Sequence, residues 1–387
     1  MPRPPAIRAF VRDRALRFTE GNQVELYETG RAGLQAMLAA IERAERRIHL
    51  ETYILRADTI GREFLTALAE RASAGVEVCV LYDAVGSLGL DEAALEPLRA
   101  AGGEVVAFNP LLAWLRFAPR RRDHRKVLVI DGSVAFTGGL NIGDEYVSGL
   151  GPVRAREEWR DAHVRVEGPC VRDLEAVFLE SWFRADGPAL AWHTLLEREP
   201  RRAGNVRCAV LADGPSHKRR RTRDLLLAAL GEAEREVLLV SPYFAPGRRV
   251  LEALAAASAR GVRVELLLAG PRIDHPSLRR AARAVLPRLL ECGVVVREYE
   301  GGMMHAKVAC FDSFYAVVGT SNLDRQSFEH SHEVNLIAED VDFAKRVRDG
   351  VLRDAARATP IDMAALSRRG FVERIRDRIA ALLLRWI

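Results

Sequence analysis

Two segments of the 387-residue chain combine a histidine, a lysine and an aspartate at the same spacing. These residues are His124, Lys126 and Asp131 in the first segment and His305, Lys307 and Asp312 in the second. Both segments follow the pattern HxKxxxxD, and each is followed by a glycine-rich turn that ends in asparagine, at Asn141 and at Asn322. An imidazole and an ammonium that project together can act on one anion, so the pattern indicates chemistry on a charged group.

The scarcity of lysine makes these positions stand out. Only four of the 58 basic residues are lysines, and two of the four lie in the repeated motif. Arginine serves elsewhere as the general cation of this chain. Lysine at the two motif positions therefore indicates a need for a compact ammonium with three rotatable donors.

The repetition extends well beyond the motifs. Residues 67–81 (ALAERASAGVEVCVL) match residues 253–267 (ALAAASARGVRVELL) without a gap, which places Gly75 on Gly261. An internal repeat of this kind predicts two diverged copies of one structural unit. We expect the two copies to be joined near residues 195–206.

Helical periodicity alternates with short apolar strands inside each copy. In the first copy we predict helices over 31–46 and 60–74 and strands over 48–54 and 76–82. This alternation indicates an α/β layered domain with a largely parallel or mixed sheet. The HxK segments are predicted to lie on strands, where alternation places the histidine and the lysine of each motif on one face.

Composition excludes several classes of protein. The chain is 49% hydrophobic and 29% charged, and it contains no run of about 18–20 apolar residues, which argues against a disordered chain and against a membrane-spanning helix. No secretory signal is recognised at the N-terminus, so a cytoplasmic location is expected. The five cysteines include no CxxC pair, which favours reduced thiols over disulfides or a zinc site.

Two segments are candidates for contact with an anionic membrane surface. Residues 111–117 (LLAWLRF) belong to a nine-residue extension before His124 and are followed by three arginines at 120–122. Residues 371–387 place apolar side chains at helical spacing between arginines. Each segment has an alternative interpretation, a buried loop for the first and a helix docked on the protein for the second.

The paired motifs resemble the phospholipase D superfamily, in which bilobal members build one active site from two HxKxxxxD motifs. Further segments resemble bacterial cardiolipin synthases, namely 122–126 (RDHRK), 136–141 (FTGGLN), 159–164 (WRDAHV), 322–328 (NLDRQSF) and 333–336 (EVNL). The resemblance covers nearly the whole chain and is greatest to the branch without N-terminal transmembrane helices. It implies two tandem phospholipase D-like α/β/α sandwich domains, at residues 1–200 and 201–387, that form a pseudo-twofold bilobal chain.

The resemblance also implies roles for individual residues. His124 is expected to be the nucleophile and His305 the general acid, with Lys126 and Lys307 neutralising the phosphate. Asp131 and Asp312 complete the catalytic motifs and are expected to anchor the turn after each strand. The remaining site residues are four phosphate-binding candidates and two carboxylates that orient the histidines: Asn141, Asn322, Ser321 and Gly139, and Asp161 and Glu333. Neither a metal nor a cofactor is implied.

The predicted function is transfer of a phosphatidyl group between two phosphatidylglycerol molecules, which yields cardiolipin and glycerol through a phosphatidyl-histidine. Alternatives are hydrolysis, another phosphatidyl donor such as phosphatidylethanolamine, a metal-independent nuclease, or a module that only binds anionic surfaces. The expected partner is anionic phospholipid at the cytoplasmic face of a bacterial membrane, where the protein binds peripherally. Nucleic acid is not an expected partner, and a monomer is the default expectation.

Overall fold

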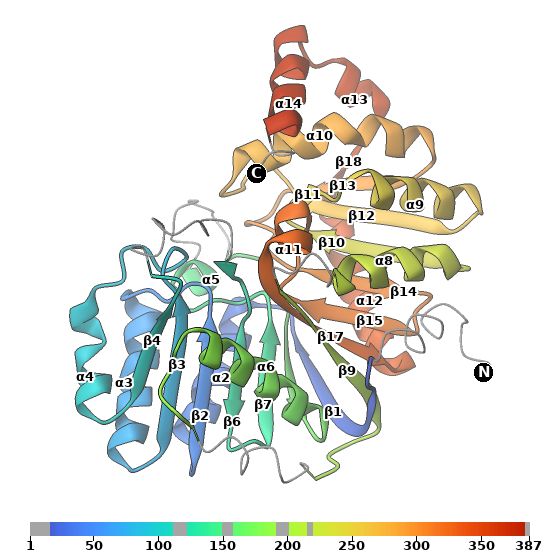
Figure 1. Ribbon diagram of the computed structural model, residues 1–387. Helices are drawn as coiled ribbons and strands as arrows, with labels where there is room; N and C mark the ends of the chain where they lie inside the picture. Colours follow the sequence, from blue (N-terminus) through green and yellow to red (C-terminus); the bar gives the residue numbers. More distant parts are fainter. Residues whose placement is uncertain (1–15, 111–121, 149–157, 191–200, 215–219, 384–387) are drawn as a thin grey trace.

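A single mixed β-sheet runs through both halves of the computed structural model (Figure 1). The structure describes residues 16–110, 122–148, 158–190, 201–214 and 220–383. The elements of the first half are β1 (Thr19–Tyr27), α2 (Gly30–Glu42), β2 (Arg47–Thr52), α3 (Thr59–Ser73), β3 (Glu77–Asp83), η1 (Glu92–Ala94), α4 (Glu96–Ala100), β4 (Glu104–Phe108), β5 (Arg122–Asp123), β6 (Val127–Ile130), β7 (Val134–Gly138), α5 (Glu145–Ser148), β8 (His163–Glu167) and α6 (Cys170–Arg184).

The second half repeats this order and adds elements at its end. Its elements are β9 (Val206–Asp213), α8 (Arg221–Glu232), β10 (Glu236–Ser241), β11 (Phe244–Ala245), α9 (Arg248–Ala259), β12 (Arg263–Ala269), α10 (Pro276–Glu291), β13 (Val295–Tyr299), β14 (Val308–Phe311), β15 (Tyr315–Gly319), β16 (Leu323–Asp324), α11 (Arg325–Glu329), β17 (Ser331–Glu339), α12 (Val341–Ala356), β18 (Ala358–Ile361), α13 (Met363–Ser367) and α14 (Phe371–Leu383).

The strand order shows the internal duplication directly. From the centre outward the first half runs β1-β8-β7-β6-β2-β3-β4, and the second runs β9-β17-β15-β14-β10-β12-β13. In each half the outer three strands of this series are parallel and the others are antiparallel. Antiparallel pairing of β1 with β9 joins the halves into one sheet. The predicted α/β fold with two related sandwich domains is confirmed.

Local sequence explains the boundaries of the repeated helices. Thr29 and Asp58 cap the N-termini of α2 and α3 by accepting hydrogen bonds from Ala32 N and Gly61 N. The matched glycines Gly75 and Gly261 both have a φ of +89°, a conformation that glycine adopts without the strain that a Cβ would cause. The expected helix-to-strand turns therefore occur at the same place in both copies.

The HxK segments do not lie within strands as predicted. His124 and Lys126 fall between β5 and β6, and His305 and Lys307 end just before β14. At His124 the chain leaves its pairing with β17 of the other half and then joins β2 of its own half. A two-residue alternation cannot reveal that the strand partner changes, which is why the sequence pattern resembled one continuous strand.

The two predicted membrane-contacting segments have different outcomes. Residues 111–117 lie outside the described residues, as do residues 195–200 of the expected junction near 195–206. The C-terminal segment forms α14 as far as Leu383 and packs against α10. No helix in the described part of the chain is long and apolar enough to cross a bilayer.

Candidate active site

Both motif histidines are positioned by backbone contacts with the opposite half of the molecule. The N–H of His124 donates to the carbonyl oxygen of His332 at 3.0 Å, and β5 pairs with β17. In the same way, the N–H of His305 donates to the carbonyl oxygen of Arg160 at 2.7 Å. The two halves therefore have to assemble before either histidine is held in place.

Each imidazole is also held by a carboxylate from the opposite half. Nδ1 of His124 lies 3.0 Å from Oε2 of Glu333, and Nδ1 of His305 lies 2.6 Å from Oδ2 of Asp161. A carboxylate that accepts the Nδ1 proton fixes the tautomer and leaves Nε2 for chemistry. The two expected orienting carboxylates thus lie beside the two expected catalytic histidines, in a pairing that crosses between the halves.

The two motif lysines are buried beside the histidines and repel each other. Nζ of Lys126 donates to the carbonyl oxygen of His124 at 2.7 Å, whereas Nζ of Lys307 lies 2.9 Å from Nε2 of His305. Burial lowers the pKa of Lys126 to about 7, with the charge of Lys307 as the next contribution, and burial lowers the pKa of Lys307 to about 8. This desolvated pair of cations is well suited to receive a phosphodiester.

The four predicted phosphate-binding residues are engaged to different degrees. Both polar atoms of the Asn141 side chain already form hydrogen bonds within the protein. Its Oδ1 accepts from Ile54 N at 3.1 Å, and its Nδ2 donates to the Tyr146 hydroxyl at 2.7 Å. Ser321 Oγ accepts a hydrogen bond from Asn335 at 2.8 Å. Oδ1 of buried Asn322 has no hydrogen-bond partner among the described residues, so its amide is the one most available to a ligand.

Gly139 is required for close approach of the backbone to Asp161. Its N–H donates to the carbonyl oxygen of Ala162 at 2.9 Å, so this donor is already used within the protein. A Cβ at position 139 would lie 1.9 Å from Oδ1 of Asp161. The structure therefore gives Gly139 a role in positioning the orienting carboxylate, and its contact with phosphate stays a prediction.

The motif aspartates lie at the far ends of β6 and β14 from the histidines. Both have positive φ angles, 54° at Asp131 and 51° at Asp312. Asp131 accepts backbone N–H groups from residues 45, 46 and 47 at 2.8–3.0 Å. Asp312 accepts those of residues 234, 235 and 236 at 2.8–3.1 Å. Both carboxylates thus fix the start of the neighbouring strand, β2 or β10, and neither hydrogen-bonds a motif histidine.

The comparison with known proteins agrees with this arrangement. The family model described as "Cardiolipin synthase, PLD-like domain" matches the chain twice, at residues 37–158 and 226–354. The chain belongs to this family. It is 38% identical over 368 residues to the cardiolipin synthase of Geobacillus thermodenitrificans, covering 94% of this chain and 72% of that protein. It is 34% identical over 367 residues to cardiolipin synthase 1 of Bacillus anthracis, with coverage of 93% and 71%.

A solved structure supports the fold over the whole length. The crystal structure of phosphatidylserine synthase from Haemophilus influenzae Rd KW20 is similar with a TM-score of 0.72 at 14% sequence identity. The alignment covers 98% of this chain and 97% of that one. The chain is thus a phospholipase D-type phosphatidyltransferase of the cardiolipin synthase family, built from two phospholipase D-like domains.

The two histidine–carboxylate pairs of this family member differ in charge. Burial raises the pKa of Glu333 to about 8, although Thr320 and Lys126 act in the opposite direction. Burial also favours the neutral form of Asp161, but the contacts with His305 and Lys307 outweigh it and lower the pKa of that carboxyl. Asp161 is therefore the carboxylate that stays ionised. Burial and the charge of Lys307 lower the pKa of His305, but Asp161 acts in the opposite direction, so His305 is better able than His124 to hold a proton.

The charges around His124 favour its neutral form. Burial lowers its pKa well below the usual value, and the positive charges of Lys126 and Lys307 lower it further. The imidazole remains 13% exposed, whereas Lys126 and Lys307 are 2% and 3% exposed. A neutral, partly accessible imidazole beside two cations has the properties of a nucleophile toward an anionic substrate.

Sequence reasoning missed two residues that support Glu333. The Thr320 hydroxyl donates to Oε2 of Glu333 at 2.5 Å, and aligning the two copies would have shown threonine where the first copy has Gly139. Arg125 is 1% exposed, and its guanidinium donates to the carbonyl oxygen of Glu333 at 3.4 Å and to Ser181 Oγ at 2.8 Å. Its place between the motif histidine and lysine was the available signal.

Three aromatic residues also surround the histidines. The Tyr53 ring meets the His124 ring edge-on with centroids 4.9 Å apart. The rings of Tyr146 and Trp159 lie 5.8 and 5.5 Å from that of His305. These contacts restrict the orientation of both imidazoles and exclude water from their flanks. Nothing in the repeated motif points to these three positions.

One group of metal-ligating side chains occurs within the described residues, at His49, Glu77 and Cys79. It lies outside the catalytic constellation. Its histidine already contacts two carboxylates, Glu77 at 3.3 Å and Glu175 at 3.3 Å, and stacks on Phe178. This arrangement explains the buried histidine as part of an ion-pair network.

Proposed function

We propose that this chain transfers a phosphatidyl group from one phosphatidylglycerol to another, forming cardiolipin and glycerol. The observation that supports this most strongly is the pair of histidines, each held at Nδ1 by a carboxylate of the opposite half, beside two buried lysines. Phosphodiester chemistry needs a nucleophile, a proton donor and cations around the phosphoryl oxygens. The choice of phosphatidylglycerol rests on the relationship to cardiolipin synthases.

In the first step, Nε2 of neutral His124 attacks phosphorus and the bond from phosphorus to the headgroup oxygen breaks. The departing oxygen takes a proton from His305, so glycerol leaves and a phosphatidyl-histidine forms. The contact between Lys307 Nζ and His305 Nε2 at 2.9 Å supports this order, because it engages the nitrogen with which His305 would otherwise attack phosphorus. Lys126 makes no corresponding contact with the His124 ring among the described residues.

In the second step, a hydroxyl on the glycerol headgroup of another phosphatidylglycerol gives its proton to His305 and attacks the same phosphorus. The bond between phosphorus and His124 breaks, and cardiolipin is released. One phosphodiester replaces another, so the exchange is nearly thermoneutral and needs no nucleotide. The ionised carboxylate of Asp161 stabilises the imidazolium that His305 becomes.

The phosphoryl oxygens would be stabilised by the lysines and by Asn322. Both ammonium groups lie within the same buried cluster as the histidines, so their interaction with an anion is weakly screened. The amide of Asn322, unoccupied at Oδ1, can turn its NH2 group toward a phosphoryl oxygen. Asn141 is better placed to hold the loop at Ile54 through its two hydrogen bonds.

The site of action would be the surface of a membrane that contains anionic lipid. Helix α14 exposes a stripe of apolar side chains, with Phe371 70%, Ile379 49% and Leu382 54% exposed. Such a stripe on a helix rich in arginine suits the interface of a bilayer. This supports peripheral binding of the enzyme to its lipid substrate.

The proposal is tested by incubating the purified protein, in excess chelator, with two phosphatidylglycerols that differ in acyl chains. Mass spectrometry should detect cardiolipin that combines both species, together with free glycerol. His124→Ala should abolish the product, and His275→Ala, which removes an exposed histidine outside the motifs, should not. Phosphatidic acid without cardiolipin would identify a hydrolase, and cleavage of DNA without lipid turnover would identify a nuclease.

A further inference from the structure

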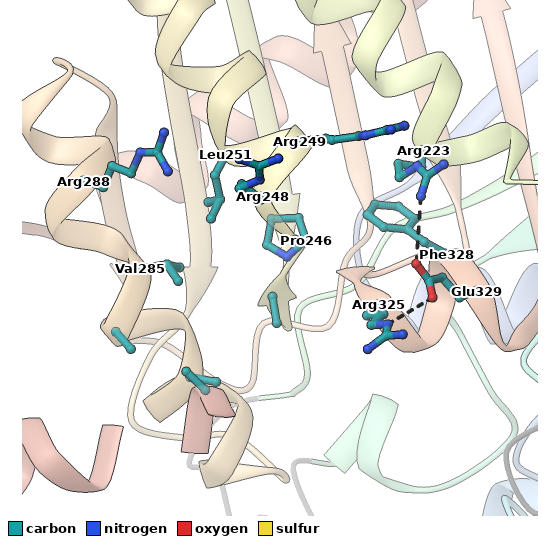
Figure 2. A pocket seen from close by; sticks show the side chains of 15 residues that line it. Arg223, Pro246, Arg248, Arg249, Leu251, Val285, Arg288, Arg325, Phe328 and Glu329 are labelled. Carbon is teal, nitrogen blue, oxygen red and sulfur yellow. Dashed lines mark hydrogen bonds and ion pairs between the residues drawn. The ribbon is translucent and has the colours of Figure 1, made fainter. Parts of the chain in front are cut away.

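A cavity of about 690 Å³ opens in the C-terminal half, between helices α8, α9, α10, α11 and α14. Figure 2 shows its side chains, which project from these helices and from the segment after β11. Its size falls within the range of small-molecule binding sites in proteins. None of the catalytic side chains lines it, so it is a separate feature of the surface.

The rim of this cavity is strongly basic. It includes five arginines and a single carboxylate: Arg223, Arg248, Arg249, Arg288, Arg325 and Glu329. Glu329 lies 3.0 Å from Arg325 and 3.9 Å from Arg223 (Figure 2), so its negative charge offsets part of the positive charge on that side of the rim. Arg249 extends toward Arg223 in Figure 2, and Arg248 and Arg288 lie on the other side of the rim. The rim therefore favours an anionic ligand.

Arg248 and Arg288 add to the charge on this side. Each is more than half exposed and lies 3.7 Å from the same carboxylate, Glu252, which does not line the cavity. One exposed carboxylate at that distance leaves most of the positive charge of the two guanidiniums uncompensated. Both remain able to bind a phosphate through paired N–H groups.

The walls of the cavity are apolar. Leu251 and Phe328 are buried at 8% and 3% exposure, and Pro246 and Val285 complete the surface between the arginines. An inorganic anion would gain no binding free energy from apolar walls. An amphiphile with an anionic head could bind the arginines with its head and bury its apolar part against the walls. The combination of charge and apolar surface is thus specific to a lipid-like ligand.

The cavity adjoins the apolar stripe of α14. Ala381 of this helix lines the cavity, while Ile375, Ile379 and Leu382 are exposed. The helix packs against α10, and its buried Asp377 forms an ion pair with Arg369 in the segment just before the helix. A bilayer that received the apolar stripe would bring its headgroups next to the arginine rim.

We propose that this cavity binds one anionic phospholipid, with its phosphate between Arg248 and Arg288 and the start of its acyl chains against Val285. The bound lipid anchors the C-terminal half on the membrane without entering the catalytic site. The cavity is nevertheless close to that site, since β11 and β16, which pair with each other, lie at its edge and Asn322 directly precedes β16.

Lipid binding can be measured without turnover in the His124→Ala background. Titration with a short-chain phosphatidylglycerol below its micellar concentration should show two bound lipids per chain, one in each site. Val285→Trp fills the cavity without changing its charge, and this variant should bind one lipid. Two bound lipids in folded Val285→Trp, checked by circular dichroism, would overturn the proposal. Inorganic phosphate that occupied the second site equally well would overturn the assignment to lipid.

Vesicle binding gives an independent test of the arginines. Neutralising Arg248 and Arg288 to glutamine should weaken binding to vesicles of phosphatidylglycerol and phosphatidylcholine by about five-fold per arginine, and should leave binding to pure phosphatidylcholine unchanged. Arg43→Gln removes an equally exposed arginine from the first half and should have little effect. An equal loss in Arg43→Gln would show diffuse charge attraction in place of a binding site.

Discussion

Replacing Glu333 with glutamine should change how the stability of the protein depends on pH. The carboxyl of Glu333 is fully buried, and burial raises its pKa from 4.5 to about 8. In the unfolded chain the same group loses its proton near pH 4.5. Between these two values the native state binds more protons than the unfolded state, so the contribution of Glu333 to stability falls as pH rises.

The size of the effect follows from the shift. A difference of 4.5 to about 8 corresponds to about 5 kcal/mol of unfolding free energy, present below pH 4.5 and lost by about pH 8. Glu333→Gln is neutral at every pH and lacks this loss. Its unfolding free energy, compared with that of the wild type, should therefore rise by up to about 5 kcal/mol between pH 4.5 and pH 8.

The assay is urea denaturation of both proteins at several pH values. The quantity compared is the difference between their unfolding free energies at each pH. The difference is used because Lys126, which both proteins retain, has a lowered pKa and makes stability rise with pH. Glu63→Gln, which alters an exposed carboxylate on α3, is the matched control for removing one carboxylate far from the site. A flat difference for Glu333→Gln would show that Glu333 is ionised across this range, and the account of the two unequal histidine–carboxylate pairs would be wrong.

Further predictions concern the groups around the site and the membrane. Asp131→Asn and Asp312→Asn should each lower the unfolding free energy by about 1–3 kcal/mol, because carboxylates that accept three N–H groups are replaced, while the products per folded molecule stay the same. Ionised Glu333 is the form that best accepts the Nδ1 proton of His124, so activity should rise with pH as Glu333 loses its proton. Thr320→Val removes a hydrogen bond that lowers the pKa of Glu333, so this rise should move to higher pH, with about a five-fold loss of activity at pH 7. An unchanged dependence of activity on pH in Thr320→Val would contradict this prediction. Ile375→Asp with Ile379→Asp should reduce cosedimentation with anionic vesicles at unchanged thermal stability, and undiminished binding would remove α14 from the membrane contact.

The repeated motifs made much of the site predictable, but not its pairing. Because the two copies carry the same motif, the sequence indicated two histidines and two carboxylates without showing which carboxylate meets which histidine. The contacts of His124 with Glu333 and of His305 with Asp161 span 209 and 144 residues. They depend on how the two halves meet, which no local pattern records.

Other differences arise where tertiary contacts override a local pattern. The amphipathic pattern of α14 left docking on the protein and contact with membrane as alternatives. The helix does dock, against α10, and Ile375 and Ile379 remain exposed. The fold class was easier to predict from the sequence, because strand and helix periodicities agree in both copies and Gly75 and Gly261 mark equivalent turns.

The most direct test of the mechanism is to trap the covalent intermediate. The protein would be mixed with phosphatidylglycerol, quenched within the first turnover under conditions that preserve phosphoramidates, digested and mapped by mass spectrometry. The account predicts a phosphatidyl group on the peptide that contains His124, and none in the His124→Ala variant. A phosphatidyl group on His305, or cardiolipin formed at full rate without any modified histidine, would contradict it.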